Sequence, residues 1–145
     1  MLQATYEDAN LILRLYELRR EEKLRKARDW FMREFSAASS EDLLKKYPPG
    51  SDENAYYRMV VGYWDMASSF LVHGIVHEEL YFETSGEALV VWEKVRPYIG
   101  ELRAGTKNPM MLNNLEKAAS RRIAWMNQNA PGAYEAFLSR LIPKK

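Results

Sequence analysis

The chain has 145 residues, of which 47% are hydrophobic and 28% charged, a composition typical of one globular domain spanning residues 1–145. Its 21 basic and 20 acidic side chains nearly cancel, so no overall field attracts nucleic acid or an anionic membrane surface. Cysteine is absent, which excludes disulfides, thiolate zinc sites, iron–sulfur clusters and cysteine nucleophiles.

The first predicted element is one long helix over residues 6–35. This segment contains neither proline nor glycine, and Thr5 with Asp8 forms the pattern of a capping box at its start. Apolar side chains recur along it every three or four residues, as on one face of a helix. About 30 helical residues would measure about 45 Å, which is long for a small domain. We therefore expect one end of this helix to project or to bend.

A short helical turn is predicted next, over residues 39–47, and Pro48-Pro49-Gly50 ends it. A second long helix follows over residues 51–82 and is the most apolar part of the chain. Apolar side chains cover most of its circumference, which is typical of a helix in the middle of a bundle or beneath a partner subunit.

The segment closest to a membrane span is the apolar run at residues 59–76. It contains Asp65 and His73, and a charged group inside a bilayer costs several kcal/mol. Residues 1–10 also lack the basic start and apolar run of a secretion signal. We therefore expect a cytoplasmic protein with no membrane contact.

A third helix is predicted to begin at a capping box formed by Thr84 and Glu87. Pro97 removes one backbone donor from this helix, so we expect a kink near Arg96. Gly105 suits the C-terminal cap of the helix.

A fourth helix is predicted to open at Asn108-Pro109, with proline at its first position. Its buried stripe is predicted to consist of Leu112, Leu115, Ala119, Ile123 and Met126. A break at residues 129–132 precedes a short closing helix, and no segment alternates between apolar and polar residues as a strand would. The chain is thus predicted to be all-α, an antiparallel bundle of four main helices plus one or two short helices.

Three stretches carry a resemblance to a known family: ELRREEKLRKARDWFMREF at 17–35, HEELYFETSGEALVVWEKV at 77–95 and NNLEKAASRRIAWM at 113–126. Their succession resembles an uncharacterised bacterial family of helical proteins, catalogued as a domain of unknown function. The resemblance covers most of the chain and implies a helical architecture. It implies no catalytic or binding residues.

The two histidines, His73 and His77, are the first candidates for a functional site. If the helix over residues 51–82 is continuous, they lie one turn and about 40° apart, a spacing that can bind one metal ion. However, the residues between them are Gly-Ile-Val, so the glutamate base of H-E-x-x-H is missing. The Glu-x-x-His pattern of di-metal bundles is missing as well. Further ligands would have to come from other helices, for example Glu17 or Glu116.

We therefore favour a structural interpretation, in which both histidines are semi-buried helix residues that bind their neighbours. Gly74 and Gly62 are then explained by close helix crossings, or Gly74 by a ligand against the backbone. The alternative is a small-molecule or metal site near Tyr63, His73 and His77. No catalytic residue, metal ligand or cofactor is assigned.

Residues 19–28 carry six basic and two acidic side chains, as a helix that faces RNA or DNA would. Acidic residues precede basic ones by four positions in three pairs, Glu21–Arg25, Glu22–Lys26 and Asp29–Arg33. This is the favourable order on a solvated helix, which is the interpretation we favour.

The leading hypothesis for function is a non-enzymatic interaction or structural module. The sequence has no G-x-S-x-G elbow, no S-x-x-K and no glycine-rich phosphate loop. We expect a protein partner or self-association, through the long first helix or the apolar second helix, and an exposed Trp125 would mark such a surface. Small-molecule or metal binding is the alternative, and nucleic-acid binding through residues 19–28 comes third.

Overall fold

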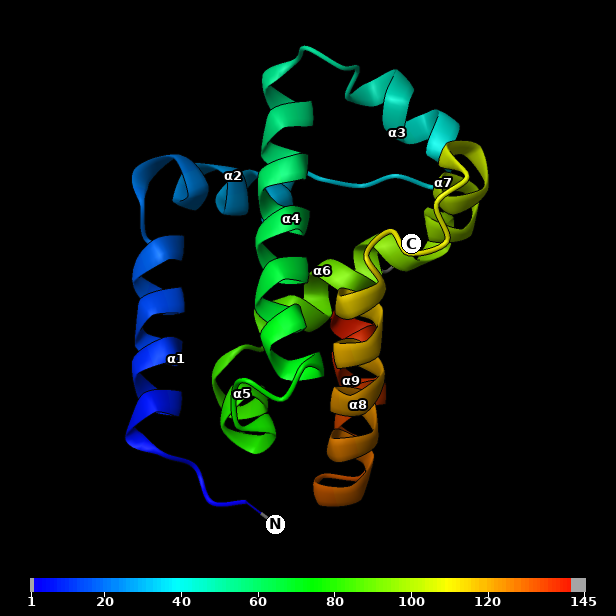
Figure 1. Cartoon of the computed structure of the whole chain (residues 1–145). Helices are drawn as coiled ribbons and strands as arrows, with labels where there is room; N and C mark the ends of the chain where they lie inside the picture. The colour runs from blue at the N-terminus through cyan, green and yellow to red at the C-terminus, as the bar shows by residue number, and fades with distance from the viewer. Residues whose placement is uncertain (1, 142–145) are drawn as a thin grey trace.

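The computed structural model describes residues 2–141, and every regular element in that part of the chain is a helix (Figure 1). The expectation of an all-α protein is therefore confirmed. In chain order the helices are α1 (Tyr6–Arg19), α2 (Glu22–Arg33), α3 (Ser40–Lys46), α4 (Asp52–Val72), α5 (Glu78–Thr84), α6 (Glu87–Val95), the 3-10 turn η1 (Arg96–Tyr98), α7 (Ile99–Thr106), α8 (Asn113–Asn129) and α9 (Ala133–Leu141). None of these described helices is both long and apolar enough to span a membrane.

Helix α4 is the centre of the molecule. It packs against α2 and against α8, which lie on different sides of it (Figure 1). Four of its buried side chains recur at helical spacing, Val60, Trp64, Ala67 and Leu71. Burial of a large apolar side chain contributes roughly 1.5–3 kcal/mol, so this face anchors the core.

The prediction of one continuous helix over residues 6–35 is wrong, because the chain turns at Arg20 and Glu21. Glu21 leaves the helical conformation, with φ −54° and ψ 140°. Its carboxylate accepts a hydrogen bond from the backbone N–H of Leu24 at 3.0 Å, which caps the start of α2. Neither proline nor glycine is needed for this bend.

A long-range contact stabilises the same turn. Arg28 of α2 donates to the carbonyl of Arg19, the last residue of α1, at 2.9 Å. The same guanidinium binds the Glu87 carboxylate of α6 with three further hydrogen bonds of 2.7–3.1 Å. Since Arg28 and Glu87 are 59 residues apart, no local pattern in the sequence reveals this contact.

The predicted helix over residues 51–82 is also wrong in its length. Helix α4 ends at Val72, and residues 73–77 form a loop before α5. Gly74 has φ +73°, the left-handed conformation that ends many helices. The backbone N–H groups of Ile75 and Val76 both donate to the carbonyl of Phe70, at 2.8 and 3.2 Å.

Neither of the two glycines expected at helix crossings lies at such a crossing. A Cβ atom added to Gly74 or to Gly62 would meet no other atom within 4 Å, so no helix presses against either one. Gly74 is needed for its positive φ, whereas Gly62 is exposed within α4.

The kink expected at Pro97 is confirmed, because α6 gives way there to η1 and then to α7. The capping box expected at the start of α6 is absent. Thr84 instead donates to the carbonyl of Leu80 at 2.8 Å, and Glu87 binds Arg28.

Helix α8 begins at Asn113, four residues after the start expected at Pro109. Its N-terminus is capped from another helix, because the Asp65 carboxylate of α4 accepts a hydrogen bond from Leu115 N–H at 2.9 Å. This contact ties the two helices together at the end where α8 starts.

Other helix ends were predicted with mixed success. The capping box of Thr5 and Asp8 is present, and the break at residues 129–132 separates α8 from α9. Gly105 lies inside α7, whose left-handed cap is Lys107 at φ +56°. Because both long helices are divided, the expected bundle of four main helices is not confirmed.

Candidate functional site

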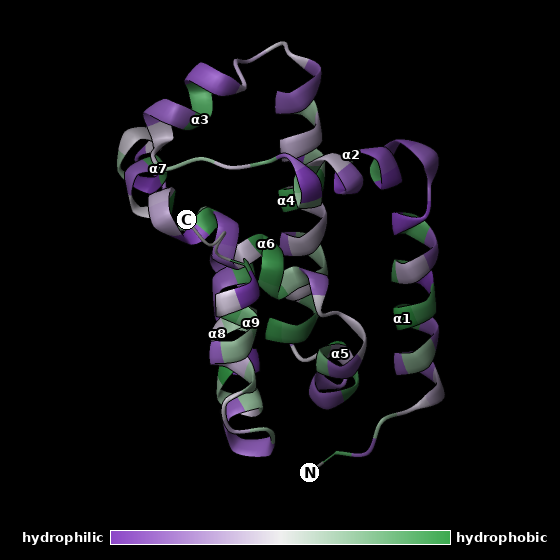
Figure 2. Cartoon of the chain, turned by 180° about the vertical axis from the view of Figure 1, so that it is seen from behind, coloured by the Kyte–Doolittle hydropathy of each residue, from purple (hydrophilic) through white to green (hydrophobic). Residues whose placement is uncertain are grey.

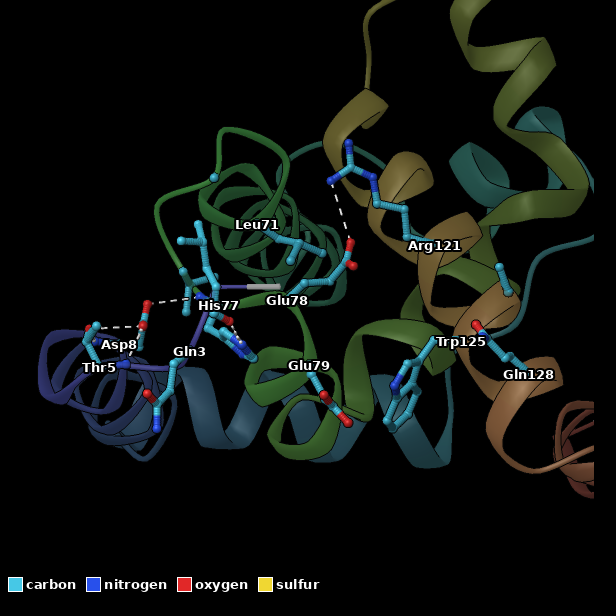
Figure 3. A pocket seen from close by; sticks show the side chains of 14 residues that line it. Gln3, Thr5, Asp8, Leu71, His77, Glu78, Glu79, Arg121, Trp125 and Gln128 are labelled. Carbon is cyan, nitrogen blue, oxygen red and sulfur yellow. Dashed lines mark hydrogen bonds and ion pairs between the residues drawn. The ribbon is translucent and has the colours of Figure 1, made fainter.

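A cleft of about 820 Å³ opens where the N-terminal segment, the loop between α4 and α5, and α8 come together (Figure 3). Apolar side chains supply part of its lining: Leu2, Leu71, Val76, Ala124 and Trp125. Charged side chains supply another part, namely Glu78, Glu79 and Arg121. Segments from both ends of the chain therefore enclose one mixed apolar and charged space.

His77 links the N-terminal segment to the start of α5 at one side of the cleft. Its Nδ1 accepts a hydrogen bond from Leu80 N–H at 3.2 Å, which caps the start of α5. Its Nε2 lies 2.9 Å from the carbonyl of Leu2. Because Nδ1 accepts, the ring proton is on Nε2, which donates to Leu2. Both ring nitrogens are thus occupied by backbone groups.

Asp8 completes this junction from α1. Its carboxylate accepts hydrogen bonds from the backbone N–H of Thr5 at 2.8 Å and from the backbone N–H of His77 at 2.9 Å. The Thr5 N–H is the main reason that the pKa of Asp8 lies below its ordinary value, and partial desolvation opposes the shift. The ionised carboxylate therefore holds the N-terminal segment against the loop before α5.

The opposite wall of the cleft belongs to α8. The Trp125 ring packs on the buried Phe82 ring with centroids 5.4 Å apart, and the Arg122 guanidinium lies 5.8 Å from the Trp125 centroid. Arg121 reaches across to Glu78 at 3.8 Å, a long ion pair between half-exposed side chains. Figure 3 shows Glu79 and Trp125 on facing sides of the space between α5 and α8.

The three residues proposed from the sequence do not come together. His77 lines the cleft, but His73 is exposed at the end of α4, and the two are no longer one helical turn apart. Tyr63 is buried, and its hydroxyl donates to the carbonyl of Leu15. Desolvation raises the pKa of the Tyr63 phenol, which fits a core residue.

The additional metal ligands suggested by the sequence lie elsewhere. Glu116 pairs with Arg103 at 2.8 Å, and Glu17 borders a shallow depression beside Arg14. Within residues 2–141 no three His, Asp or Glu side chains gather closely enough to hold a metal ion.

The basic run at residues 19–28 is not one solvent-facing stripe. Arg28 points inward to Glu87, and Arg19 lies over the Trp64 ring at 5.2 Å. Of the three expected i,i+4 ion pairs, Asp29–Arg33 forms at 2.9 Å, while Glu21 caps α2 instead.

Sequence reasoning missed most of the cleft. The contact of His77 with Leu2 joins residues 75 positions apart, and Arg121 and Gln128 had no distinguishing pattern. Trp125 was singled out only as a mark of a partner surface. The one usable signal was Gly74, because a glycine after an apolar helical run is a common helix stop.

The sequence profile of one family matches residues 4–122. The chain belongs to this family, which is described as a domain of unknown function, DUF4760. No curated protein and no solved structure matches the chain significantly. The matched range contains Asp8, His77 and Arg121 but stops before Trp125, so the far part of the α8 wall lies outside it.

Proposed function

We propose that this protein binds a small amphiphilic molecule in the cleft beside His77. The supporting observation is the cleft itself, whose 820 Å³ falls in the range of roughly 300–1,000 Å³ typical of small-molecule sites. Its lining combines five apolar side chains with eight polar or charged ones, which suits a molecule that has both an apolar and a polar part.

The residues suggest how such a ligand would lie. An apolar body would contact Leu71, Val76 and Trp125, and a polar group would reach Glu79 or Arg121. Glu79 has no ion-pair partner within residues 2–141, which leaves its carboxylate open to a ligand donor.

The same geometry favours binding over catalysis. A general base needs a free nitrogen within hydrogen-bond reach of its substrate. Both ring nitrogens of His77 already hold backbone groups, so this histidine shapes the cleft instead.

The test is a pair of tryptophan substitutions at exposed alanines. Ala124→Trp fills the cleft, whereas Ala104→Trp places the same side chain on α7, away from it. Nile red serves as a neutral probe. We expect its affinity to fall at least about tenfold in Ala124→Trp alone, because the free energy lost when the dye can no longer be buried exceeds about 1.4 kcal/mol. Equal binding by all three proteins would contradict the proposal.

A second candidate function is a protein-interaction module, and one observation favours it. The outward side of α1 exposes three large side chains, Tyr6, Leu13 and Tyr16, although large apolar groups on a solvated helix face are usually scattered singly. This surface, called the outer face of α1 below, is separate from the cleft. The apolar helix α4 is interior and offers no comparable surface.

A further inference from the structure

Helix α1 forms one edge of the molecule, and only one of its two sides packs against the rest (Figures 1 and 2). Leu15 is 3% exposed and Leu11 packs against the core, so these two mark the inner side. On the other side Tyr6 is 80%, Leu13 58% and Tyr16 47% exposed. The helix is therefore apolar on two opposite faces, of which one has no cover.

The exposed side chains form one stripe within a sector of about 80° around the helix axis. Tyr6 and Leu13 are seven residues apart, which places them about 20° from each other around the helix axis. Tyr16 and Arg20 continue the stripe three and seven residues after Leu13. A stripe with this spacing is the seam that packs against a second helix.

The charges at the two ends of α1 are opposite. Its first turn exposes Glu7 and its end exposes Arg20, whereas Asp8 and Arg19 contact His77 and Trp64 of the same molecule. The guanidiniums of Arg19 and Arg20 lie 5.1 and 5.6 Å from the centre of the Tyr16 ring. The positive backbone dipole end coincides with the acidic turn and the negative end with the arginines. An identical helix laid antiparallel therefore meets complementary charge at both ends.

We propose that the outer face of α1 pairs with the same face of a second copy of this chain, antiparallel and two-fold symmetric about Leu13. In this register Leu13 contacts its own copy, and Tyr6 of one protomer lies beside Arg20 of its partner. Ala9, which is small, lies opposite the Tyr16 ring. The Tyr6 ring of one protomer and the Arg20 guanidinium of its partner then form a cation–π contact across the interface.

A second copy suits this face better than an unrelated partner for two reasons. Reversing the helix about Leu13 brings the end that carries the exposed Glu7 beside the end that carries the exposed Arg20. Isologous two-fold contacts are also the commonest oligomer interfaces. One helix face buries less than about 1,200 Å² in total, which is the range of weak and transient complexes.

This inference rests on the second candidate function, that the outer face of α1 is an interaction surface. Sedimentation equilibrium between about 10 μM and about 1 mM covers the concentrations at which a weak dimer forms. We expect the apparent mass to rise from 17.0 kDa toward twice that value.

Leu13→Glu places a charge at the symmetry axis and is expected to abolish the rise in mass. Leu44→Glu is the matched control, because Leu44 is 50% exposed on α3 and lies outside the stripe. Both substituted sites are exposed, so circular dichroism should show unchanged helix content in each.

Disulfide mapping tests the orientation, and it starts from a chain without cysteine. Asn10→Cys and Glu17→Cys are mixed and oxidised, and mass spectrometry compares mixed with self-paired disulfides. The antiparallel register brings residue 10 of one protomer beside residue 17 of its partner, so the mixed product should predominate. Asn10→Cys mixed with Ala104→Cys measures the collisional background.

The outcomes separate the two ideas. A chain that is monomeric at every concentration overturns the self-pairing but leaves the outer face of α1 available to another partner. A dimer that persists in Leu13→Glu places the interface elsewhere and overturns both the pairing and the interaction surface. A dimer lost in Leu13→Glu whose disulfides are mainly self-paired overturns the antiparallel register.

Discussion

At the scale of single residues, His77 connects parts of the chain that are far apart in sequence. Its backbone N–H binds Asp8 of α1, its Nδ1 caps α5 through Leu80, and its Nε2 holds the carbonyl of Leu2. One side chain and one amide thus join the N-terminal segment, α1 and α5. These three hydrogen bonds hold the cleft wall near the N-terminus together.

The two histidines offer a direct comparison of structural importance. We expect His77→Ala to lower the free energy of unfolding by about 1–2 kcal/mol, because an N-terminal cap is lost. His77→Asn should restore about half of this loss, since asparagine caps helices well but is too short to reach Leu2. His73→Ala, at an exposed site, should stay within about 0.5 kcal/mol of the parent protein. Urea titration measures all three, and equal effects at the two positions would refute the role given to His77.

At the scale of elements, the loop at residues 73–77 decides where the cleft forms. If α4 had continued to Phe82 as predicted, His77 would have stayed on the helix and no wall would face α8. The left-handed Gly74 ends α4, and the chain reverses onto the carbonyl of Phe70. The position of the cleft therefore follows from where α4 ends.

Two glycines in and after α4 should respond oppositely to the same substitution. Gly74→Ala is expected to cost about 1 kcal/mol of stability, because φ +73° strains any residue with a Cβ atom. Gly62→Ala should instead stabilise the protein by about 0.5–1 kcal/mol, since it lies inside a helix with nothing near its Cβ. Thermal and urea unfolding would measure both. A loss of stability in both variants would show that Gly62 has a packing role after all.

The elements that could be predicted from sequence are those fixed by local chemistry. Thr5 with Asp8, and Pro97, determine a helix start and a kink through their own backbone and neighbours. The two missed breaks have different causes. The turn at Glu21 combines a cap by its own carboxylate with the distant Arg28–Glu87 contact, whereas the break at Gly74 had a local signal that the surrounding apolar pattern masked. The cleft could not be predicted, because its walls are assembled by these breaks.

At the scale of the whole molecule, the Arg28–Glu87 contact helps to hold the end of α1 against the core. The pair links α2 to α6, and the same guanidinium binds the carbonyl of Arg19 at the end of α1. Helix α1 is also held by apolar packing of Leu11, Ile12 and Leu15. Polar contacts add to this packing: Asp8 accepts from His77 N–H, and the Tyr63 hydroxyl donates to the carbonyl of Leu15. Since α1 carries both the Asp8 wall of the cleft and the outer face, a shift of α1 would disturb both proposed surfaces.

Removing the charge of Glu87 should therefore loosen α1 as well as lower stability. We expect Glu87→Gln to cost about 1–3 kcal/mol, because a largely buried charged hydrogen-bond pair is weakened. Asp29→Asn breaks the exposed Arg33 pair and should cost less than about 0.5 kcal/mol. Hydrogen exchange should be faster throughout α1 in Glu87→Gln but not in Asp29→Asn. The two variants are compared at temperatures equally far below their unfolding midpoints. If α1 stays equally protected in both variants, its other contacts with the core hold the helix, and the cleft wall does not depend on the ion pair.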